Sequence, residues 1–503
     1  MTVAAAAPEQ TSALYRWGLM AFLTLAVTLY GLTLLVVTVL LPQMQGTLSA
    51  TQDQIAWAVT FNLLATAVVT PMTGWLINRF GRRSVMLVGA AGFTLATVGC
   101  GIADSLLTLV LYRVAQGGFG APLVPLGQAI TLDTFPKHQH GMATSIFGMA
   151  VVIGPAFGPL LGGYLAEQYD WRWAFFMIVP FGIAAFVGLM ALLRDKGRSG
   201  GVRLDWTGFL ALSATVVGLQ LMLDRGQRQD WFESTEIVIW AVLALVALHV
   251  FVVHSASARQ PFLNPRLLAD RNYALGQVIV FIYGMMNFTP MVLLPPMLKT
   301  LYGVPDDAIG YVVAARGLGA LIGFFSSMYL SKLDPRVGMA GGFALQSVAG
   351  YLMAGFDFNV TIGMVAAVSV IQGICVGVVW VPLTVATFAT LPPNLVPEGS
   401  AVFHLLRNLG SSIFIALSVN LVIVSGRQSY AQLAEFVTPL NPIMTLPWAM
   451  GGYSIAEPEA LGRLAGEVGR QAALIGYIDA FLLYTVSSAL AIPLVLLLRI
   501  RRA

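Results

Sequence analysis

The sequence predicts an all-α integral membrane protein on three observations. First, 57% of the 503 residues are hydrophobic and only 10% are charged, whereas soluble domains carry roughly 25% charged residues. Second, the apolar residues fall into fourteen runs, and a helix that spans a bilayer needs about 20 such residues. Third, Lys and Arg gather in alternate loops between the runs, as they do in loops that face the cytoplasm.

The fourteen runs follow one another with mostly short loops. The expected transmembrane helices are residues 17–41, 54–77, 84–102, 106–130, 142–165, 174–194, 206–223, 236–255, 273–297, 308–330, 338–356, 362–388, 401–424 and 475–498. The first is expected to be retained, because its apolar run is longer than that of a signal peptide and shows no clear cleavage site. The seventh and eleventh runs are the weakest.

The distribution of charge predicts that both termini lie in the cytoplasm. In that orientation the inside segments hold 17 Lys and Arg residues, the outside segments hold 7, and 3 more fall inside helices. The net charge of +4 is therefore attributed to loop asymmetry rather than to nucleic-acid binding, since no basic run carries interleaved aromatic residues. The two cysteines, Cys100 and Cys375, lie in apolar runs and are expected as small core residues.

One loop is long, residues 425–473, and it is expected to be periplasmic. Two of its stretches, "SGRQSYAQLAEF" and "PEALGRLAGEVGRQAALIGY", look amphipathic. They predict helices that form either a solvated cap or a docking surface for a periplasmic partner.

The stretch "GWLINRFGRR" stands at the cytoplasmic end of the second helix. A glycine, a tight turn and several cations at a membrane boundary predict at least a positive-inside anchor. The spacing also resembles the loop signature between helices 2 and 3 of the major facilitator superfamily, which latches neighbouring helices by charge pairing. The matching residues are Gly74, Arg79, Gly81, Arg82 and Arg83. Asn78 replaces the usual Asp, so a weakened latch is expected.

The fourth helix carries Arg113 near its middle, with Gln116 three residues later on the same face. An arginine inside a membrane costs a few kcal/mol on insertion scales and marks a functional site by default. A structural arginine bonded to backbone carbonyls is the alternative. The stretch is similar to the helix 4 motif of the same superfamily, whose Arg is implicated in proton coupling.

The stretch "GPAFGPLLGG" lies in the fifth helix and repeats glycine every four residues. Such a stripe lets two helix backbones approach closely, and prolines bend a membrane helix where neighbours satisfy the freed groups. Plain helix packing is one interpretation. The stretch also resembles the antiporter motif of drug exporters in the superfamily. The matching residues are Gly154, Gly158, Pro159, Gly162 and Gly163.

Further stretches extend the likeness over nearly the whole chain, among them "DWRWAFF", "LMLDRGQRQDWF" and "EGSAVFHLLRNLGSSI". The chain resembles the fourteen-helix drug:proton antiporter-2 branch of the major facilitator superfamily, the EmrB/QacA type. This implies a six-helix bundle in residues 1–194, two inserted helices in 195–255 and a second six-helix bundle in 256–503. It also implies a substrate site near the midplane that is exposed alternately to each side.

The chain departs from the family at the first helix, where Thr33 stands at the position of the usual Asp. None of the 23 acidic residues lies in the middle of an expected helix, yet a proton-coupled carrier needs a group that titrates. The candidates for coupling, besides Arg113, Gln116 and Arg407, are Asp133 at the end of the fourth helix and His404 in the thirteenth. A helix-end carboxylate and a packing histidine are the alternatives.

Arg316 and Arg407 join Arg113 as intramembrane cations without an obvious buried acid. Either carbonyls and helix-end carboxylates compensate them, or they attract an anionic amphiphile. The expected substrate pocket combines polar groups with Met and aromatic walls, which adapt to varied lipophilic ligands. Its candidate residues are Asn62, Tyr283, Met286, Asn287 and Arg316. A lipid-facing stripe is the alternative for the ninth helix.

The resemblance implies an inner-membrane exporter of amphiphilic toxic compounds, driven by proton antiport without a cofactor. It also implies a periplasmic membrane-fusion adaptor and an outer-membrane channel as partners. Export of an endogenous anionic amphiphile, such as a fatty acid, lipid or siderophore, is the alternative, and a membrane receptor or scaffold is a third. An enzyme is not expected, because the sequence shows no phosphate-binding loop, metal-ligand cluster or Ser-His-Asp arrangement.

Overall fold

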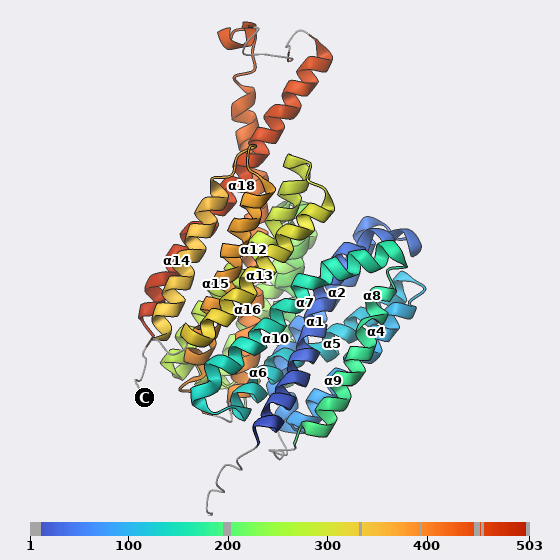
Figure 1. The fold of residues 1–503 in the computed structure, drawn as a ribbon, viewed down its shortest axis with the longest axis vertical. Helices are drawn as coiled ribbons and strands as arrows, with labels where there is room; N and C mark the ends of the chain where they lie inside the picture. Colours follow the sequence, from blue (N-terminus) through green and yellow to red (C-terminus); the bar gives the residue numbers. More distant parts are fainter. Residues whose placement is uncertain are drawn as a thin grey trace, which may run out of the picture. The chain divides into compact units, whose positions relative to one another are not determined.

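The computed structural model describes residues 12–194, 203–330, 334–392, 395–446, 453 and 457–498. In these residues thirteen helices are long and apolar enough to cross a membrane, and two compact units are present (Figure 1). Unit 1 is Met1–Ser213, Val250–Leu267 and Leu391–His404, and unit 2 is Ala214–His249, Leu268–Thr390 and Leu405–Ala503. The expected division at residues 194 and 256 stays a prediction, and the cationic loop residues 195–202 lie outside the described part.

The helices of unit 1 coincide with the first six expected runs. They are α1 (Ala13–Thr47), α2 (Gln52–Val69), η1 (Thr70–Met72), α3 (Thr73–Phe80), α4 (Arg82–Ile102), α5 (Leu106–Gly120), α6 (Leu123–Thr134), η2 (Lys137–Gln139), α7 (His140–Gln168), α8 (Trp173–Phe176) and α9 (Ile178–Leu192). Helix α1 lies against α7 and α9, α2 lies against α5, and α4 lies against α5 and α9.

The fourth expected helix is present as two segments, α5 and α6, which is why thirteen rather than fourteen single helices reach spanning length. Pro122 has no N–H to continue the helical hydrogen bonds, and the break falls at Ala121 and Pro122. Both residues keep right-handed helical backbone angles. The two segments together therefore occupy the expected fourth run.

The next elements belong partly to each unit or wholly to unit 2. They are α10 (Trp206–Gly226), η3 (Gln227–Gln229), η4 (Trp231–Glu233), α11 (Thr235–Ser257), η5 (Pro265–Ala269), α12 (Arg271–Tyr302), α13 (Asp306–Leu330), α14 (Pro335–Ala354), α15 (Ile362–Phe388), α16 (Val396–Ala434), η6 (Pro442–Thr445) and α18 (Pro458–Leu496). In unit 2, α15 packs against α12, α13 and α14, and α18 packs against α12 and α14.

Local sequence signals set where several helices begin and end. The Thr51 hydroxyl accepts the backbone N–H of Gln54, whose side chain accepts the N–H of Thr51, and this capping box starts α2. The Asp270 carboxylate caps the start of α12 by accepting the backbone N–H of Tyr273. Gly303 ends α12 with φ of 64°, a left-handed conformation that glycine adopts without steric cost.

The two cysteines lie in the cores, as expected. Cys100 in unit 1 and Cys375 in unit 2 both have 0% of their surface exposed, and both are free thiols. They pack as small apolar side chains.

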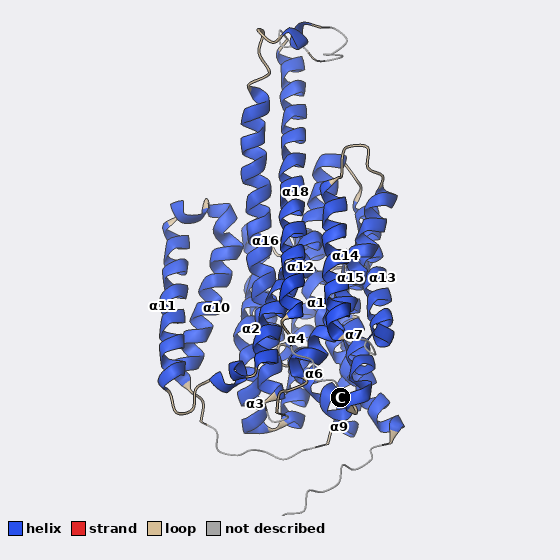
Figure 2. Ribbon diagram, turned by 90° about the vertical axis from the view of Figure 1, so that its left-hand side faces the viewer, coloured by secondary structure: helices blue, strands red, loops and turns tan. Residues whose placement is uncertain are grey.

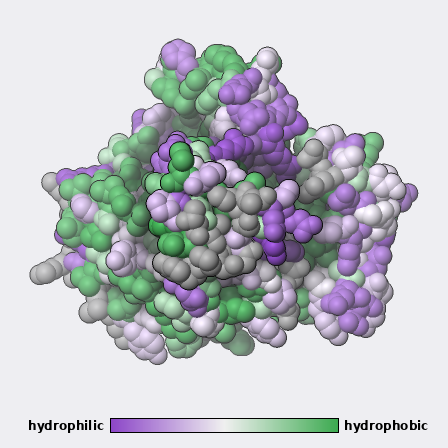
Figure 3. Space-filling model, turned by 90° about the horizontal axis from the view of Figure 1, so that it is seen from above, coloured by the Kyte–Doolittle hydropathy of each residue, from purple (hydrophilic) through white to green (hydrophobic). Residues whose placement is uncertain are grey.

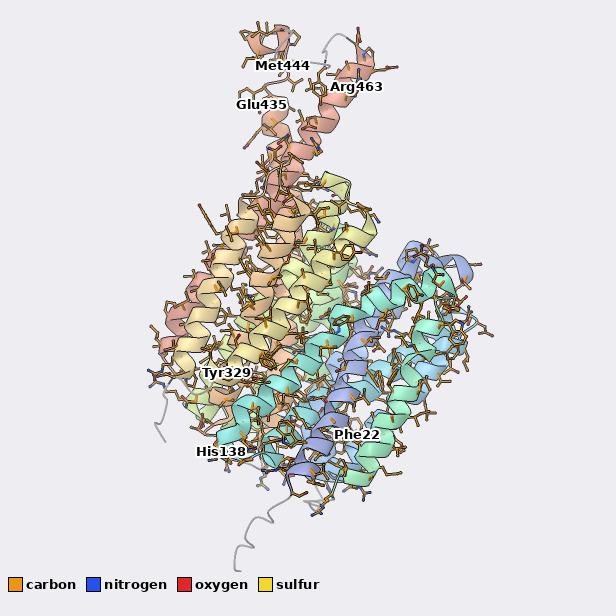
Figure 4. All side chains as sticks on the ribbon, in the orientation of Figure 1. Phe22, His138, Tyr329, Glu435, Met444 and Arg463 are labelled. Atoms are coloured by element: carbon orange, nitrogen blue, oxygen red, sulfur yellow. The ribbon has the colours of Figure 1, made fainter. Side chains whose placement is uncertain are left out.

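The loop between α16 and α18 is shorter than the predicted range of residues 425–473. Helix α16 continues to Ala434 and α18 begins at Pro458, so both amphipathic stretches extend membrane helices and project beyond α12–α15 (Figure 2). Figure 3 views this end and shows hydrophilic and hydrophobic residues in mixed patches. Glu435, Met444 and Arg463 lie at the tip of the projection (Figure 4). Helices were predicted in both stretches and are confirmed, but their continuation of α16 and α18 was not predicted, and their role as a cap or docking surface stays open.

The turn before α10 is held by the Asp205 carboxylate in unit 1. It accepts hydrogen bonds from the backbone N–H groups of Gly208 at 3.1 Å and Phe262 at 3.0 Å, and lies 2.8 Å from His254 Nε2. Burial alone would raise the pKa of Asp205, but these hydrogen bonds outweigh it and hold the pKa below its ordinary value. The carboxylate therefore ties the start of α10 to the end of α11 and to the chain that follows.

Acid is expected to remove this contribution to stability. Because the folded-state pKa lies below the unfolded value of about 3.9, the stabilisation is complete above that value and is lost as the pH falls through the folded-state pKa. The thermal unfolding midpoint of the parent should therefore fall more steeply below about pH 4 than that of Asp205→Asn. Asp104→Asn, at an exposed turn, serves as the control and should follow the parent. Parallel profiles for parent and Asp205→Asn would contradict the assignment.

Candidate transport site

Unit 1 buries Arg113 of α5 completely, with 0% of its surface exposed. Its Nε donates to the Ala58 carbonyl at 2.9 Å, and its Nη1 donates to the Thr33 carbonyl at 3.3 Å and to Gln116 Oε1. Gln116 in turn donates to Thr97 Oγ1 at 2.8 Å. The structure thus brings Arg113 and Gln116 together, as the spacing predicts, and backbone carbonyls serve as the arginine's acceptors.

Asn62 of α2 belongs to the same cluster rather than to an open pocket. Its Nδ2 donates to the Arg113 carbonyl at 2.8 Å, and it is 1% exposed. A Cβ on Gly117 would lie 2.4 Å from the Asn62 carbonyl oxygen, so α2 and α5 are in backbone contact here. Arg113 Nη2 has no hydrogen-bond partner among the described residues, which leaves one donor of the buried cation available.

Thr33 lies directly against this cation. Its hydroxyl donates to the Tyr30 carbonyl at 2.7 Å, and its own carbonyl accepts from Arg113. The position at which the family resemblance implies an Asp is therefore adjacent to Arg113, and in this chain it contributes only a backbone oxygen to the cation.

Unit 2 contains a second buried arginine cluster, around Arg316 of α13. Arg316 Nε donates to Gln372 Oε1 at 2.6 Å, and Nη2 donates to Asn287 Oδ1 at 2.9 Å and to its carbonyl. The network continues from Gln372 Nε2 to the Tyr484 hydroxyl at 3.4 Å, which also accepts from Gln346 at 2.9 Å. Two of the predicted pocket residues, Arg316 and Asn287, are thus joined directly.

Each cluster draws its central polar groups from three helices of its own unit. In unit 1 these groups are Thr33 of α1, Asn62 of α2 and Arg113 of α5. In unit 2 they are Asn287 of α12, Arg316 of α13 and Gln372 of α15. The sequence analysis did not predict Gln372, Gln346 or Tyr484 as members of this network. Each could have been found as a polar side chain within an otherwise apolar run.

The remaining predicted residues of unit 2 are packed rather than exposed to lipid. Tyr283 is 2% exposed and Met286 is 0% exposed, and the Tyr283 hydroxyl donates to the Val376 carbonyl at 3.2 Å. The Tyr283 ring packs on Trp380 at 5.4 Å between centroids. Arg407 places its guanidinium carbon 5.4 Å from the centre of the same Trp380 ring, a cation–π contact.

His404 is joined to α6 of unit 1. Its Nε2 is hydrogen-bonded to Gln128 Oε1, and it is 2% exposed. One turn earlier, Ser400 donates to the Pro125 carbonyl at 3.0 Å. Arg407, which follows on the same helix, belongs to unit 2. Gln128 is a partner of His404 that the sequence did not predict, because nothing in the pattern places α6 beside α16.

The motif "GWLINRFGRR" was expected to form only a weakened latch, because Asn78 replaces the usual Asp, yet it does take part in an ion pair. Arg82, at the start of α4, makes an ion pair with Asp133 at the end of α6. Arg83 Nη2 donates to the Met190 carbonyl of α9 at 3.0 Å, and Arg79 is exposed. Asp133 thus supplies a carboxylate to this cluster despite the absence of an acid within the motif itself.

Two glycines of this stretch have a clear steric role. Gly81 has φ of 86° and separates α3 from α4, a conformation that favours glycine. A Cβ on Gly74 would lie 3.0 Å from Glu398 Cβ, so α3 approaches the start of α16 within unit 1. The Glu398 side chain accepts the backbone N–H of Asn264.

The glycine stripe of α7 packs directly on α1, which lies beside it in Figure 1. A Cβ on Gly154 would lie 2.2 Å from the Thr28 carbonyl oxygen, and one on Gly158 would lie 2.9 Å from that of Leu32. A Cβ on Gly162 would lie 2.4 Å from the side-chain Cγ2 of Val36 on α1. The close approach predicted from the stripe is confirmed.

The prolines of α7 contribute at the same contact. Pro155 Cδ would lie 2.9 Å from a Cβ on Gly31, so this ring needs a glycine opposite it on α1. Gly163 has only an ordinary contact, 3.6 Å to Val39. The side chain of Pro159 lies outside the described residues. Within the described part of the chain, no group of three or more His, Cys, Asp or Glu side chains could hold a metal ion.

Comparisons with known proteins agree with this architecture. The family model of the Major Facilitator Superfamily matches residues 22–265 and 278–434. The multidrug export protein EmrB of Escherichia coli K12 is 32% identical over 91% of this chain and 90% of its own length. The fatty acid resistance protein FarB of Neisseria gonorrhoeae is 29% identical over 94% of each chain.

A solved structure has the same fold. The crystal structure of the human organic anion transporter MFSD10 covers 95% of this chain and 100% of its own, with a TM-score of 0.62 at 13% identity. The match by the family model, the EmrB likeness and the two helical units lead to one conclusion: the chain belongs to the major facilitator superfamily, among its EmrB-type permeases.

Proposed function

We propose that this protein exports amphiphilic toxic compounds across the bacterial inner membrane by proton antiport, through alternating access. The observation that carries the proposal is the glycine stripe of α7 on α1, whose spacing matches the antiporter motif of drug exporters. The similarity to EmrB over nine-tenths of both chains supports the same substrate class. No cofactor is required, because a transmembrane proton gradient supplies the free energy.

His404 is proposed as the proton acceptor of the transport cycle. Imidazole is the side chain that titrates near neutral pH without perturbation, and His404 is buried in unit 1. The Gln128 amide oxygen lies on its Nε2, which favours the tautomer with a proton on that nitrogen. Asp133 is a second candidate, because breaking its ion pair with Arg82 would let the carboxylate take a proton.

Proteoliposomes with an imposed pH gradient test the proposal. The parent should take up ethidium and release protons only with the gradient present, and His404→Gln should reduce proton-coupled uptake by at least about tenfold, which corresponds to about 1.4 kcal/mol. His138→Gln, a substitution outside the clusters, serves as the control and should behave as the parent. Failure of the parent to move any amphiphile under either gradient direction would overturn the proposal.

The projecting ends of α16 and α18 are proposed as the docking surface for a periplasmic membrane-fusion adaptor, with an outer-membrane channel beyond it. Exposed apolar side chains in the loop that follows α16 favour a partner: Phe436 is 64% exposed and Leu440 is 89% exposed. This assignment also requires both termini to lie in the cytoplasm, as the loop charges predict.

Export of an anionic amphiphile is the second candidate function. Arg113 and Arg316 are buried cations whose hydrogen-bond acceptors are amide and carbonyl oxygens. The relative FarB is named as a fatty acid resistance protein. In the same proteoliposomes, a response to a medium-chain fatty acid with none to ethidium would favour this function.

A further inference from the structure

A small cavity lies beside Arg316, inside unit 2. Its volume of about 10 Å³ leaves room for about one water molecule. Its walls come from α12, α13 and α15. The lining residues are Pro290, Met291, Leu294, Pro295, Leu298, Ile309, Val312, Val313, Arg316 and Ser369. Only the last two bring a hydrogen-bond donor of their side chains to an otherwise apolar chamber.

One nitrogen of Arg316 is left for this cavity. Nε and Nη2 donate to the oxygens of Gln372 and Asn287. Nη1 has only the Met291 sulfur, at 3.9 Å, and a thioether is a weak acceptor. Among the described residues, no oxygen accepts from Nη1.

Ser369 provides a second, independent observation. It is 1% exposed, and its Oγ has no hydrogen-bond partner among the described residues. A buried hydroxyl without a partner is costly and usually indicates a missing water or ligand. Two donors therefore border the same cavity, one charged and one neutral.

The charge of Arg316 is also uncompensated within the described chain. Its side chain donates to the oxygens of Gln372 and Asn287 and to the Met291 sulfur, all of which are uncharged acceptors. No described carboxylate bonds to it. A cation inside a membrane protein is normally paired or faces water, and amide oxygens supply dipoles but no counter-charge.

We propose that this cavity binds one monovalent anionic group, held between Arg316 Nη1 and the Ser369 hydroxyl. The size admits one small ion such as a halide. The shared chemistry is a single negative charge that accepts from both donors. The proposal does not depend on proton coupling or on the direction of transport.

The test is the thermal unfolding midpoint of the purified full-length protein in lipid nanodiscs. Sodium gluconate, whose anion is too large for the cavity, is replaced at constant ionic strength by sodium chloride in one arm and by sodium acetate, whose anion is also larger than one water molecule, in another. The parent midpoint should rise saturably in the chloride arm and stay unchanged in the acetate arm. That result identifies a halide site and supports the proposal.

Variants connect the response to the two donors. Ser369→Ala should weaken the apparent anion affinity at least threefold, and Arg316→Gln should abolish the response. Ser369→Asp supplies a tethered carboxylate, so it should raise the midpoint in gluconate above that of the parent and remove the anion dependence. Ser327→Ala is the matched control, because this buried serine already donates to the Gly377 carbonyl at 2.9 Å.

The proposal is overturned if the parent shows no saturable response to chloride. It is also overturned if Ser369→Ala binds as tightly as the parent and the Ser327→Ala control. If Arg316→Gln does not fold, the two Ser369 variants decide the outcome, since they leave the arginine and its amide partners in place.

Discussion

Replacing Gly154 by alanine is expected to destabilise the packing of α1 on α7 by about 3 kcal/mol or more, at the upper end of overpacking costs. The new Cβ would lie 2.2 Å from the Thr28 carbonyl oxygen and 2.6 Å from the Leu32 nitrogen. Both atoms are backbone, so no rotamer change relieves the clash and the helices must separate. The thermal unfolding midpoint and the yield of monodisperse protein measure the effect, and ethidium transport should be lost with them.

A graded series along the same helix provides the controls. Gly158→Ala, 2.9 Å from the Leu32 oxygen, should give an intermediate loss. Gly163→Ala, only 3.6 Å from Val39 Cγ1, should leave the midpoint unchanged or slightly raised, because alanine favours a helix by about 1 kcal/mol over glycine. Equal midpoints for the Gly154 and Gly163 variants would show that the stripe does not set the helix separation.

The fold was largely predictable because the length of each apolar run can be read directly along the sequence. Apolar runs of sufficient length must become helices in a bilayer, and all fourteen expected runs coincide with described helices or helix pairs. The break at Pro122 was missed, since a proline in a membrane helix is tolerated and its local effect depends on neighbours. The extension of α16 to Ala434 was understated because an amphipathic stretch gives no hydropathy signal.

The candidate site was predictable only in part. Arg113 and Gln116 are three residues apart on one helix, so helical geometry alone joins them. The partners of Arg316 and His404 come from other helices, at Gln372 and Gln128. Such pairings depend on how helices rotate and slide against one another, and hydropathy contains no information on either. A search for every amide within an apolar run would have found both glutamines.

Replacing Arg113 by alanine is expected to reduce proton-coupled ethidium transport at least about tenfold, or about 1.4 kcal/mol. The substitution leaves the Gln116 side-chain oxygen without its donor and removes one of the two hydrogen bonds at the Ala58 and Thr33 carbonyls, which keep their helical donors. A buried acceptor that loses its donor costs about 1–3 kcal/mol, so the unfolding midpoint should also fall. Arg470→Ala, at an exposed ion pair with Glu467, is the control for both measurements.

Arg113→Lys distinguishes the charge from the hydrogen-bond pattern. An ammonium keeps the positive charge, but it cannot reproduce the planar fork that reaches three acceptors in fixed directions. If the charge is what transport requires, the lysine variant should retain coupled uptake well above that of Arg113→Ala while sharing its lowered midpoint. If the fork is required, both variants should lose uptake equally. Parent-like uptake in Arg113→Ala would remove Arg113 from the mechanism.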